Sequence, residues 1–175
     1  MKATSLLEKQ HRKVEGILKK LESGKSDTSA LLRELADDLA AHMAIEQQIF
    51  YPAVRSLKKG LVAESFEEHA IAELALKRLL ATSPTADSFK AKVTTLKELI
   101  EHHVEEEEEE LFPSVEKKID EEALENLGKR MKAAFEAALE KGFEGLVPKS
   151  MATTTADADN RSESKNGDAR TSPRP

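Results

Sequence analysis

Apolar residues recur along most of the chain at alternating steps of four and three, the spacing that lines one face of an α-helix. This pattern predicts four helices, over about 4–23, 28–58, 61–82 and 84–112, and a fifth over about 121–140. Ser5, with Glu8 three residues later, predicts a capping box at the first helix start. Helices of similar length joined by short polar loops are typical of an antiparallel up-down-up-down four-helix bundle, so we predict an all-α fold.

The expected domain covers residues 1–146, the four-helix bundle with an additional C-terminal helix. That fifth helix contains no His, and we assign it to packing. After Pro148 the chain turns to small and polar residues, with Met151 its one large apolar side chain. Such a composition cannot bury enough apolar surface to fold, so we predict that residues 147–175 are a disordered tail.

Four of the five His residues continue the apolar series of four different helices: His11, His42, His69 and His103. His11 and His69 are 58 positions apart, and His42 and His103 are 61 apart. The first two helices therefore repeat as the third and fourth. Such a repeat would bring two equivalent half-sites together across the bundle axis.

One segment of the repeat carries most of the candidate chemistry. His42 is followed by Glu46 and, after an aromatic residue, by Pro52; the same order recurs as His103, Glu107 and Pro113. Residues four apart lie on one helix face, with Cβ atoms about 5–6 Å apart. Each copy therefore presents an imidazole and a carboxylate in one direction, which is half of a metal site.

A single inward-facing His is usually a hydrogen-bonded core residue. That explanation does not suffice for four imidazoles and two carboxylates at one level of a bundle, because burying so many polar and charged groups is costly without compensation. A bound cation would offset that cost. The alternative, a metal-free helical bundle that binds a protein partner, predicts no stoichiometric metal and little change in melting on chelation.

Composition narrows the choice of cation. The chain has no Cys, so thiolate zinc sites, iron–sulfur clusters and disulfides are excluded. His and carboxylate ligands suit iron, manganese or zinc, but six or more donors are too many for one zinc ion. They favour a pair of iron ions about 3.5–4 Å apart.

Charge and terminal sequence suggest the class of protein. The net charge of −6, with no basic cluster, argues against a nucleic-acid partner. The N-terminal residues lead directly into a charged amphipathic pattern, and no long uncharged apolar stretch follows. We expect a soluble, cytoplasmic protein with no membrane association and an unidentified protein partner, if any.

The order His, His-x-x-x-Glu, His, His-x-x-x-Glu, with an aromatic-Pro pair after each Glu, resembles the hemerythrin family, in its HHE cation-binding branch. The resemblance covers about residues 4–140. It implies a non-haem di-iron centre, oxo- or hydroxo-bridged. It also implies the ligands, with four terminal His and two bridging Glu residues: His11, His42, His69, His103, Glu46 and Glu107.

The chain departs from the oxygen-carrier pattern of that family. Glu73 stands where carriers have a second His on the third helix, and His103 pairs with Glu107 rather than with an Asp five residues on. Glu73 is a candidate seventh ligand, and its mate in the repeat, Glu15, is a weaker one. The alternative for both is an ordinary solvated helix carboxylate.

In the fourth predicted helix, two adjacent His residues, His102 and His103, compete for the inward-facing position. His103 rather than His102 continues the apolar series and matches the His-to-Pro distance of the first copy, so His102 is expected beside the site. The run Glu105–Glu110 is mostly a solvated face, since only every third or fourth residue points inward. Glu106 would replace Glu107 if the register were misread.

These expectations lead to a functional hypothesis. The resemblance implies a ferrous pair that binds a small diatomic ligand or peroxide, and an anionic Glu73 ligand would favour the ferric state over reversible oxygen carriage. Oxygen or redox sensing, or iron handling, is the preferred function, and no catalytic residue is assigned. A catalase-like enzyme remains an alternative. A ferroxidase of the ferritin-like class is weaker, because its Glu-x-x-His spacing occurs on one helix here, in Glu8 and His11.

Overall fold

The computed structural model describes residues 1–24 and 27–147 of the 175-residue chain. These residues are helical throughout, apart from short connections, and contain no strand, which confirms the predicted all-α class. The elements follow one another along the chain as α1 (Ala3–Ser23), α2 (Thr28–Ile45), η1 (Glu46–Phe50), α3 (Tyr51–Val54), α4 (Lys59–Leu80), α5 (Ser88–Glu106), η2 (Glu107–Leu111), α6 (Phe112–Lys118) and α7 (Glu121–Leu146). The predicted tail lies, from residue 148 on, outside the described residues.

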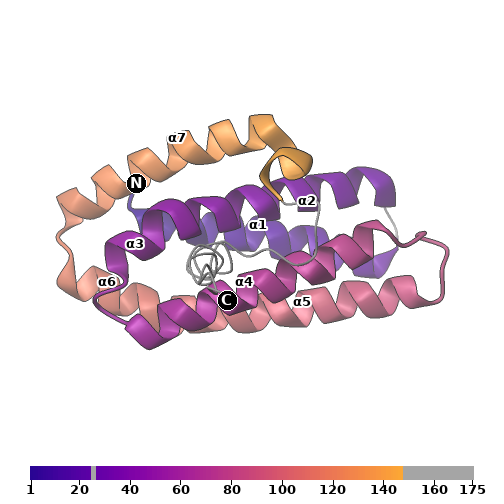
Figure 1. Ribbon diagram of the computed structural model, residues 1–175, viewed down its shortest axis with the longest axis horizontal. Helices are drawn as coiled ribbons and strands as arrows, with labels where there is room; N and C mark the ends of the chain where they lie inside the picture. Colours follow the sequence, from indigo (N-terminus) through magenta and orange to yellow (C-terminus); the bar gives the residue numbers. More distant parts are fainter. Residues whose placement is uncertain (25–26, 148–175) are drawn as a thin grey trace, which may run out of the picture.

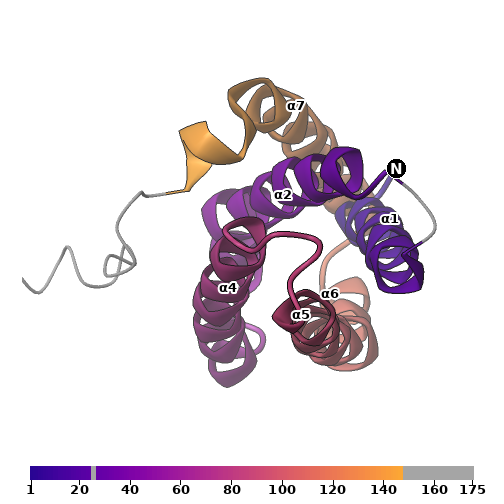
Figure 2. The same ribbon diagram turned by 90° about the vertical axis from the view of Figure 1, so that its right-hand side faces the viewer.

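Four rods form the bundle. They are α1, α2 continued by η1 and α3, α4, and α5 continued by η2 and α6, and successive rods run antiparallel (Figure 1). Viewed from one end, α1, α2, α4 and α5 surround a common axis (Figure 2). Helix α7 lies outside this group, along α2 and α1, as expected for a helix that serves packing.

The bundle axis holds two apolar clusters with a polar layer between them. One cluster includes Val14, Leu39 and Ile100, and the other includes Leu7, Phe50 and Leu111. Six of the buried polar side chains come from the repeated motif: His11, His42, Glu46, His69, His103 and Glu107. The sequence pattern therefore placed these polar residues correctly on the inward helix faces.

Two of the four rods, the second and the fourth, each contain one π-helical turn, and each turn begins at the Glu of the repeated motif. Tyr51 N–H bonds to the carbonyl of Glu46, and Phe112 N–H bonds to that of Glu107, so both hydrogen bonds span five residues. Pro52 and Pro113 follow directly, in the first turn of α3 and α6, where a missing N–H is tolerated. The predicted helix end near Pro113 is therefore wrong, since the rod continues to Lys118.

Two other boundaries differ from expectation. The first helix begins at Ala3, and its N-cap residue, Lys2, makes no side-chain cap bond, so the predicted capping box of Ser5 and Glu8 is wrong. Helix α7 extends beyond residue 140, with a break at Gly142, whose φ of 64° favours glycine. The N–H of Phe143 then donates to Oδ1 of Asp37 at 2.8 Å, which fastens the end of α7 to α2.

Candidate metal centre

The structure brings six of the seven predicted ligands to one buried level of the bundle. Four helices each contribute one His, and the two π-turns each contribute their first residue, a Glu. None of these six residues is more than 4% exposed, and both carboxylates are fully buried. The six residues are His11 on α1, His42 on α2, Glu46 on η1, His69 on α4, His103 on α5 and Glu107 on η2.

The four imidazoles form two equivalent pairs. The rings of His11 and His42 meet edge to face, with centroids 4.8 Å apart and planes at 77°. The rings of His69 and His103 do the same at 4.7 Å and 64°, and their Nε2 atoms are 3.1 Å apart. Two imidazole nitrogens at this separation can bind the same metal ion. The internal repeat of the sequence thus appears as two half-sites.

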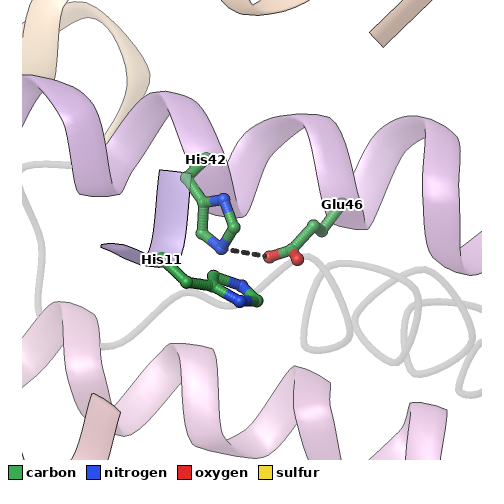
Figure 3. Close-up of side chains that lie close together, drawn as sticks. All are labelled: His11, His42 and Glu46. Carbon is green, nitrogen blue, oxygen red and sulfur yellow. Dashed lines mark ion pairs between the residues drawn. The ribbon is translucent and has the colours of Figure 1, made fainter. Parts of the chain in front are cut away.

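Each carboxylate lies between the two half-sites. Glu46 Oε2 is 3.1 Å from Nε2 of His42 and 3.3 Å from Nε2 of His69. Glu107 Oε2 is 3.4 Å from Nε2 of His11 and 3.8 Å from Nε2 of His103. Figure 3 shows His42 and Glu46 on the same face of their rod, with His11 facing them from α1. A carboxylate so placed could bridge two ions.

Several of these buried atoms have no hydrogen-bond partner within the described part of the chain. They are both oxygens of Glu46, Oε2 of Glu107 and Nε2 of His11. A buried carboxylate without hydrogen bonds is costly, and a cation between the carboxylates would satisfy these atoms together. The residues present therefore fit a metal ion chemically as well as geometrically.

The environment keeps two of the imidazoles neutral. Burial is the main cause that holds the pKa of His42 and of His69 well below the usual value of 6.5. The nearest imidazoles, His11 for His42 and His103 for His69, lower these pKa values further. Only a neutral imidazole has a lone pair for a metal ion, so these two side chains are ready to bind one at neutral pH.

The two carboxylates differ sharply in their surroundings. Burial, followed by the charge of Glu107, raises the pKa of Glu46 well above its ordinary value. Burial acts in the same direction on Glu107, but the close contact with Nε2 of His11, 3.4 Å away, and the charges of His103 and His11 together lower its pKa. For His11, burial lowers the pKa, but its contacts with Glu107 and Glu108 outweigh this and raise it. Without an ion, a proton shared by this pair therefore favours Glu46 over Glu107.

Four further polar side chains orient the imidazoles from outside. His11 Nδ1 donates to Glu108 at 2.8 Å, His42 Nδ1 donates to Gln10 at 2.8 Å, and His103 Nδ1 donates to Glu68 at 2.7 Å. The amide of Gln47 lies 3.2 Å from Nδ1 of His69. Such contacts fix the ring and leave Nε2 facing the centre.

Sequence reasoning missed these four residues, although the repeat contained a signal. Gln10 and Glu68 are 58 positions apart, as His11 and His69 are, and Gln47 and Glu108 are 61 apart. Each of these four residues is adjacent in sequence to one predicted ligand, and its side chain contacts the imidazole of a different predicted ligand on another helix. The repeat could therefore have identified them once helix pairing was known.

Comparison with known proteins decides the family. Residues 2–115 match the model of the hemerythrin HHE cation binding domain. The chain belongs to this family. One solved relative is a hemerythrin HHE cation binding domain-containing protein, the Rv2633c homolog from Mycobacterium kansasii. The two are 28% identical with a TM-score of 0.72, and the match covers 81% of this chain and 89% of the other.

Two curated relatives show how far the hemerythrin similarity extends. Uncharacterized protein Rv2633c of Mycobacterium tuberculosis is 25% identical over 140 residues, which are 78% of this chain and 86% of that protein. A DNA nickase of Nostoc sp. is 32% identical over 102 residues, or 58% of this chain. The match spans only 29% of the nickase, so it concerns one part of a longer protein.

An aromatic side chain covers one His in each half of the hemerythrin-type centre. Phe112 stacks on His11 with centroids 5.9 Å apart and planes at 9°, and Tyr51 lies 5.5 Å from His69. Tyr51 and Phe112 are equivalent in the repeat, but only Tyr51 carries a hydroxyl. That hydroxyl donates to Oε1 of Glu107 at 2.9 Å and lies 3.2 Å from Nε2 of His69. The two halves are therefore chemically different.

A small cavity adjoins the four imidazoles. Its volume is about 10 Å³, and apolar side chains make up the rest of its wall: Val14, Leu39, Met43, Ile100 and Val104. This space is about that of one water-sized molecule. The centre is therefore bordered by a very small apolar chamber.

The remaining predicted candidates lie away from this centre. Glu73 pairs with Lys77 at 2.6 Å, and its side chain is 30% exposed, so the structure does not bring the seventh predicted ligand into the cluster. Glu15 pairs with Arg12 at 3.1 Å. Glu106, the alternative to Glu107, faces His102 on the outside of the bundle. The geometry supports the original register, and ligation by Glu73 stays a prediction.

No helix among residues 1–24 and 27–147 combines the length and the apolar character that crossing a membrane requires.

Proposed function

We propose that this hemerythrin-family chain is a non-haem di-iron protein whose buried centre binds O2, or a related small ligand, for oxygen or redox sensing or for iron handling. The observation that carries the proposal is the convergence of four imidazoles and two carboxylates at one buried level. Imidazole and carboxylate ligands without thiolate suit iron. Six donor residues, of which two are carboxylates that can bridge, suit two ions about 3.5–4 Å apart.

The half-sites suggest how the ligands divide. His11 and His42 would hold one ion, His69 and His103 the other, and Glu46 and Glu107 would bridge them. When bound, iron supplies the ability to exchange electrons with a small oxygen-containing ligand. The protein supplies fixed imidazoles, an apolar chamber that limits water, and the Tyr51 hydroxyl beside Glu107.

The chamber favours a ligand of very few atoms. A space of about 10 Å³ bordered by apolar side chains is close to that of one water molecule, so a diatomic molecule or peroxide needs only small side-chain shifts, whereas an organic substrate needs extensive rearrangement. This supports a sensing or redox function at the centre itself.

Metal content tests the proposal directly. Elemental analysis of the full chain should give two iron ions per chain, with near-ultraviolet charge-transfer absorption in the oxidised protein. His42→Ala and Glu107→Gln should each lose most of this iron, whereas the exposed Glu109→Gln keeps it. Wild-type protein that folds fully, retains no iron after reconstitution and melts unchanged with chelator would instead be the metal-free interaction bundle.

Peroxide decomposition is a second candidate, favoured by the hydroxyl of Tyr51. Burial, then the charges of Glu107 and Glu46, raise the pKa of Tyr51 well above 10, so its proton is retained at neutral pH and is held at Oε1 of Glu107. A proton at this atom could be delivered to a leaving oxygen. Oxygen release from peroxide by the iron form, lost in Tyr51→Phe with iron content unchanged, would support this candidate.

A further inference from the structure

A second group of potential ligands lies outside the buried centre, on the seam between α4 and α5. Glu68, His102 and Glu106 each offer one ligand atom, and these atoms all lie within 4.8 Å of one another. His102 Nε2 is 3.8 Å from Oε1 of Glu68 and 3.7 Å from Oε1 of Glu106. The side chain of His102 is 64% exposed, and those of Glu68 and Glu106 are 18% and 25% exposed. The group is therefore reachable from solvent.

Unlike a purely acidic surface, this group combines an imidazole with two carboxylates that are mostly covered. Glu106 Oε2 is shielded from solvent and has no hydrogen-bond partner within the described residues. Like charges on Glu68, Glu64 and Glu110 add to the negative potential at Glu106. A shielded carboxylate oxygen without a partner, in a negative field, is an environment that a cation would stabilise.

The two neighbouring His residues of α5 point to different sites. His103 faces the buried centre, and His102 faces the surface. Glu68 connects them, because its Oε2 accepts from Nδ1 of His103 at 2.7 Å while its Oε1 faces His102. One carboxylate thus contributes to the support of the buried centre and to the outer group at the same time.

We propose that Glu68, His102 and Glu106 form a second metal site, which binds one divalent transition-metal cation at the bundle surface. One imidazole and two carboxylates suit zinc, manganese or ferrous iron, and water completes the coordination on the exposed side. The site binds more weakly than the buried centre, since it offers three protein ligands instead of six and remains open to water. It does not depend on the identity of the buried cation.

Occupancy of this outer site affects the buried centre through Glu68. A cation that draws on Oε1 reduces the negative charge available at Oε2, and so weakens the hydrogen bond from His103. The basicity of that imidazole, and with it the affinity of the centre for its own ion, then falls. By linkage, an ion at the buried centre weakens the outer site by the same factor.

Calorimetric titration of the full chain with Zn²⁺ tests the outer site, with three variants for comparison. Wild-type protein should bind one more Zn²⁺ per chain than His102→Ala. Glu106→Gln should weaken this binding by at least about tenfold, whereas Glu109→Gln, which removes the same charge from an exposed position on the same rod, should leave it unchanged. In wild-type protein, Zn²⁺ should also shift the imidazole nitrogen resonances of His102.

Equal Zn²⁺ stoichiometry and affinity in wild-type protein, His102→Ala and Glu106→Gln would overturn the proposal. So would an equal loss in Glu109→Gln, because that result would indicate diffuse attraction to the acidic surface. Iron content, measured separately on the same samples, reports on the buried centre. A chain without iron that still loses one Zn²⁺ on His102→Ala would refute the proposed function and leave the outer site intact.

Discussion

Replacement of Glu46 by Leu should stabilise the metal-free protein while abolishing its stabilisation by metal. Glu46 is fully buried, and neither of its oxygens has a hydrogen-bond partner among the residues described. Leu has a similar size and no polar atom. The substitution therefore tests, at one position, whether the Glu side chain destabilises the metal-free fold and is needed for ion binding.

The magnitude follows from counting unsatisfied groups. Each buried polar atom without a partner costs about 1–3 kcal/mol, so removing two oxygens gains about 2–6 kcal/mol. His42 Nε2 loses its neighbour at 3.1 Å, which costs about 1–3 kcal/mol in return. The central values, about 4 kcal/mol gained and about 2 kcal/mol lost, leave a net gain of about 2 kcal/mol. This corresponds to a rise in Tm of about 4–8 °C for a domain of this size.

The gain should depend on pH in a defined direction. Burial raises the pKa of Glu46 in the folded protein above 4.5, the value expected in the unfolded chain. The free energy of unfolding of the wild-type protein is therefore largest below pH 4.5, where Glu46 is protonated, and decreases as the pH rises through the raised pKa. The advantage of Glu46→Leu over wild-type protein, measured in chelator, should therefore grow as the pH increases.

Thermal melting followed by circular dichroism, in chelator and in excess metal, is the assay. With free metal at a hundredfold above Kd, the wild-type protein should gain about 2.7 kcal/mol, and Glu46→Leu should gain far less. Exposed Glu109→Leu serves as the control and should shift neither melt by more than about 0.5 kcal/mol. A variant that melts below wild type in chelator, or that keeps the full metal response, would refute the reasoning.

Three further predictions concern packing, ring orientation and proton release. Gly128→Ala should destabilise the fold by about 1–3 kcal/mol in denaturant titration, because its Cβ would lie 2.4 Å from the carbonyl oxygen of Met1, whereas Gly16→Ala, with no atom within 4 Å, should be neutral or stabilising. Glu108→Ala should weaken metal binding by about 10–100-fold, because His11 loses its Nδ1 acceptor, and equal affinity in wild type and variant would contradict that role. Metal binding should release a proton from Glu46, so the apparent affinity measured between about pH 5 and 8 should fall as the pH is lowered, and a flat profile would exclude this release.

Much of the architecture could be predicted because the apolar spacing is regular and repeats. The inward placement of His42 and Glu46, and of their mates 61 positions later, required only the helical period. The imidazole contacts of Gln10 and Glu68 could not be derived in this way, since they depend on which helices face each other.

Glu73 shows the limit of spacing arguments. Four residues along an α-helix bring a side chain back to within about 40° of the starting direction, which is close to the same face but not identical to it. On α4, the next turn offers Lys77, and the carboxylate of Glu73 pairs with that ammonium group 2.6 Å away. Local charge pairing along one helix therefore places this side chain, and the sequence spacing could not distinguish the two outcomes.

The two π-turns bear on how insertions and deletions in evolution could alter this protein. Each adds one residue to a turn of its rod, so deleting a single residue from 46–50 would restore a regular helix. That deletion would turn everything beyond it by about 100° and draw it back by about 1.5 Å, carrying the Tyr51 hydroxyl away from Glu107. A shorter and more regular rod would remain a good bundle component with an incomplete centre. Length variation at these two turns should therefore separate relatives that retain the chemistry from those that retain only the scaffold.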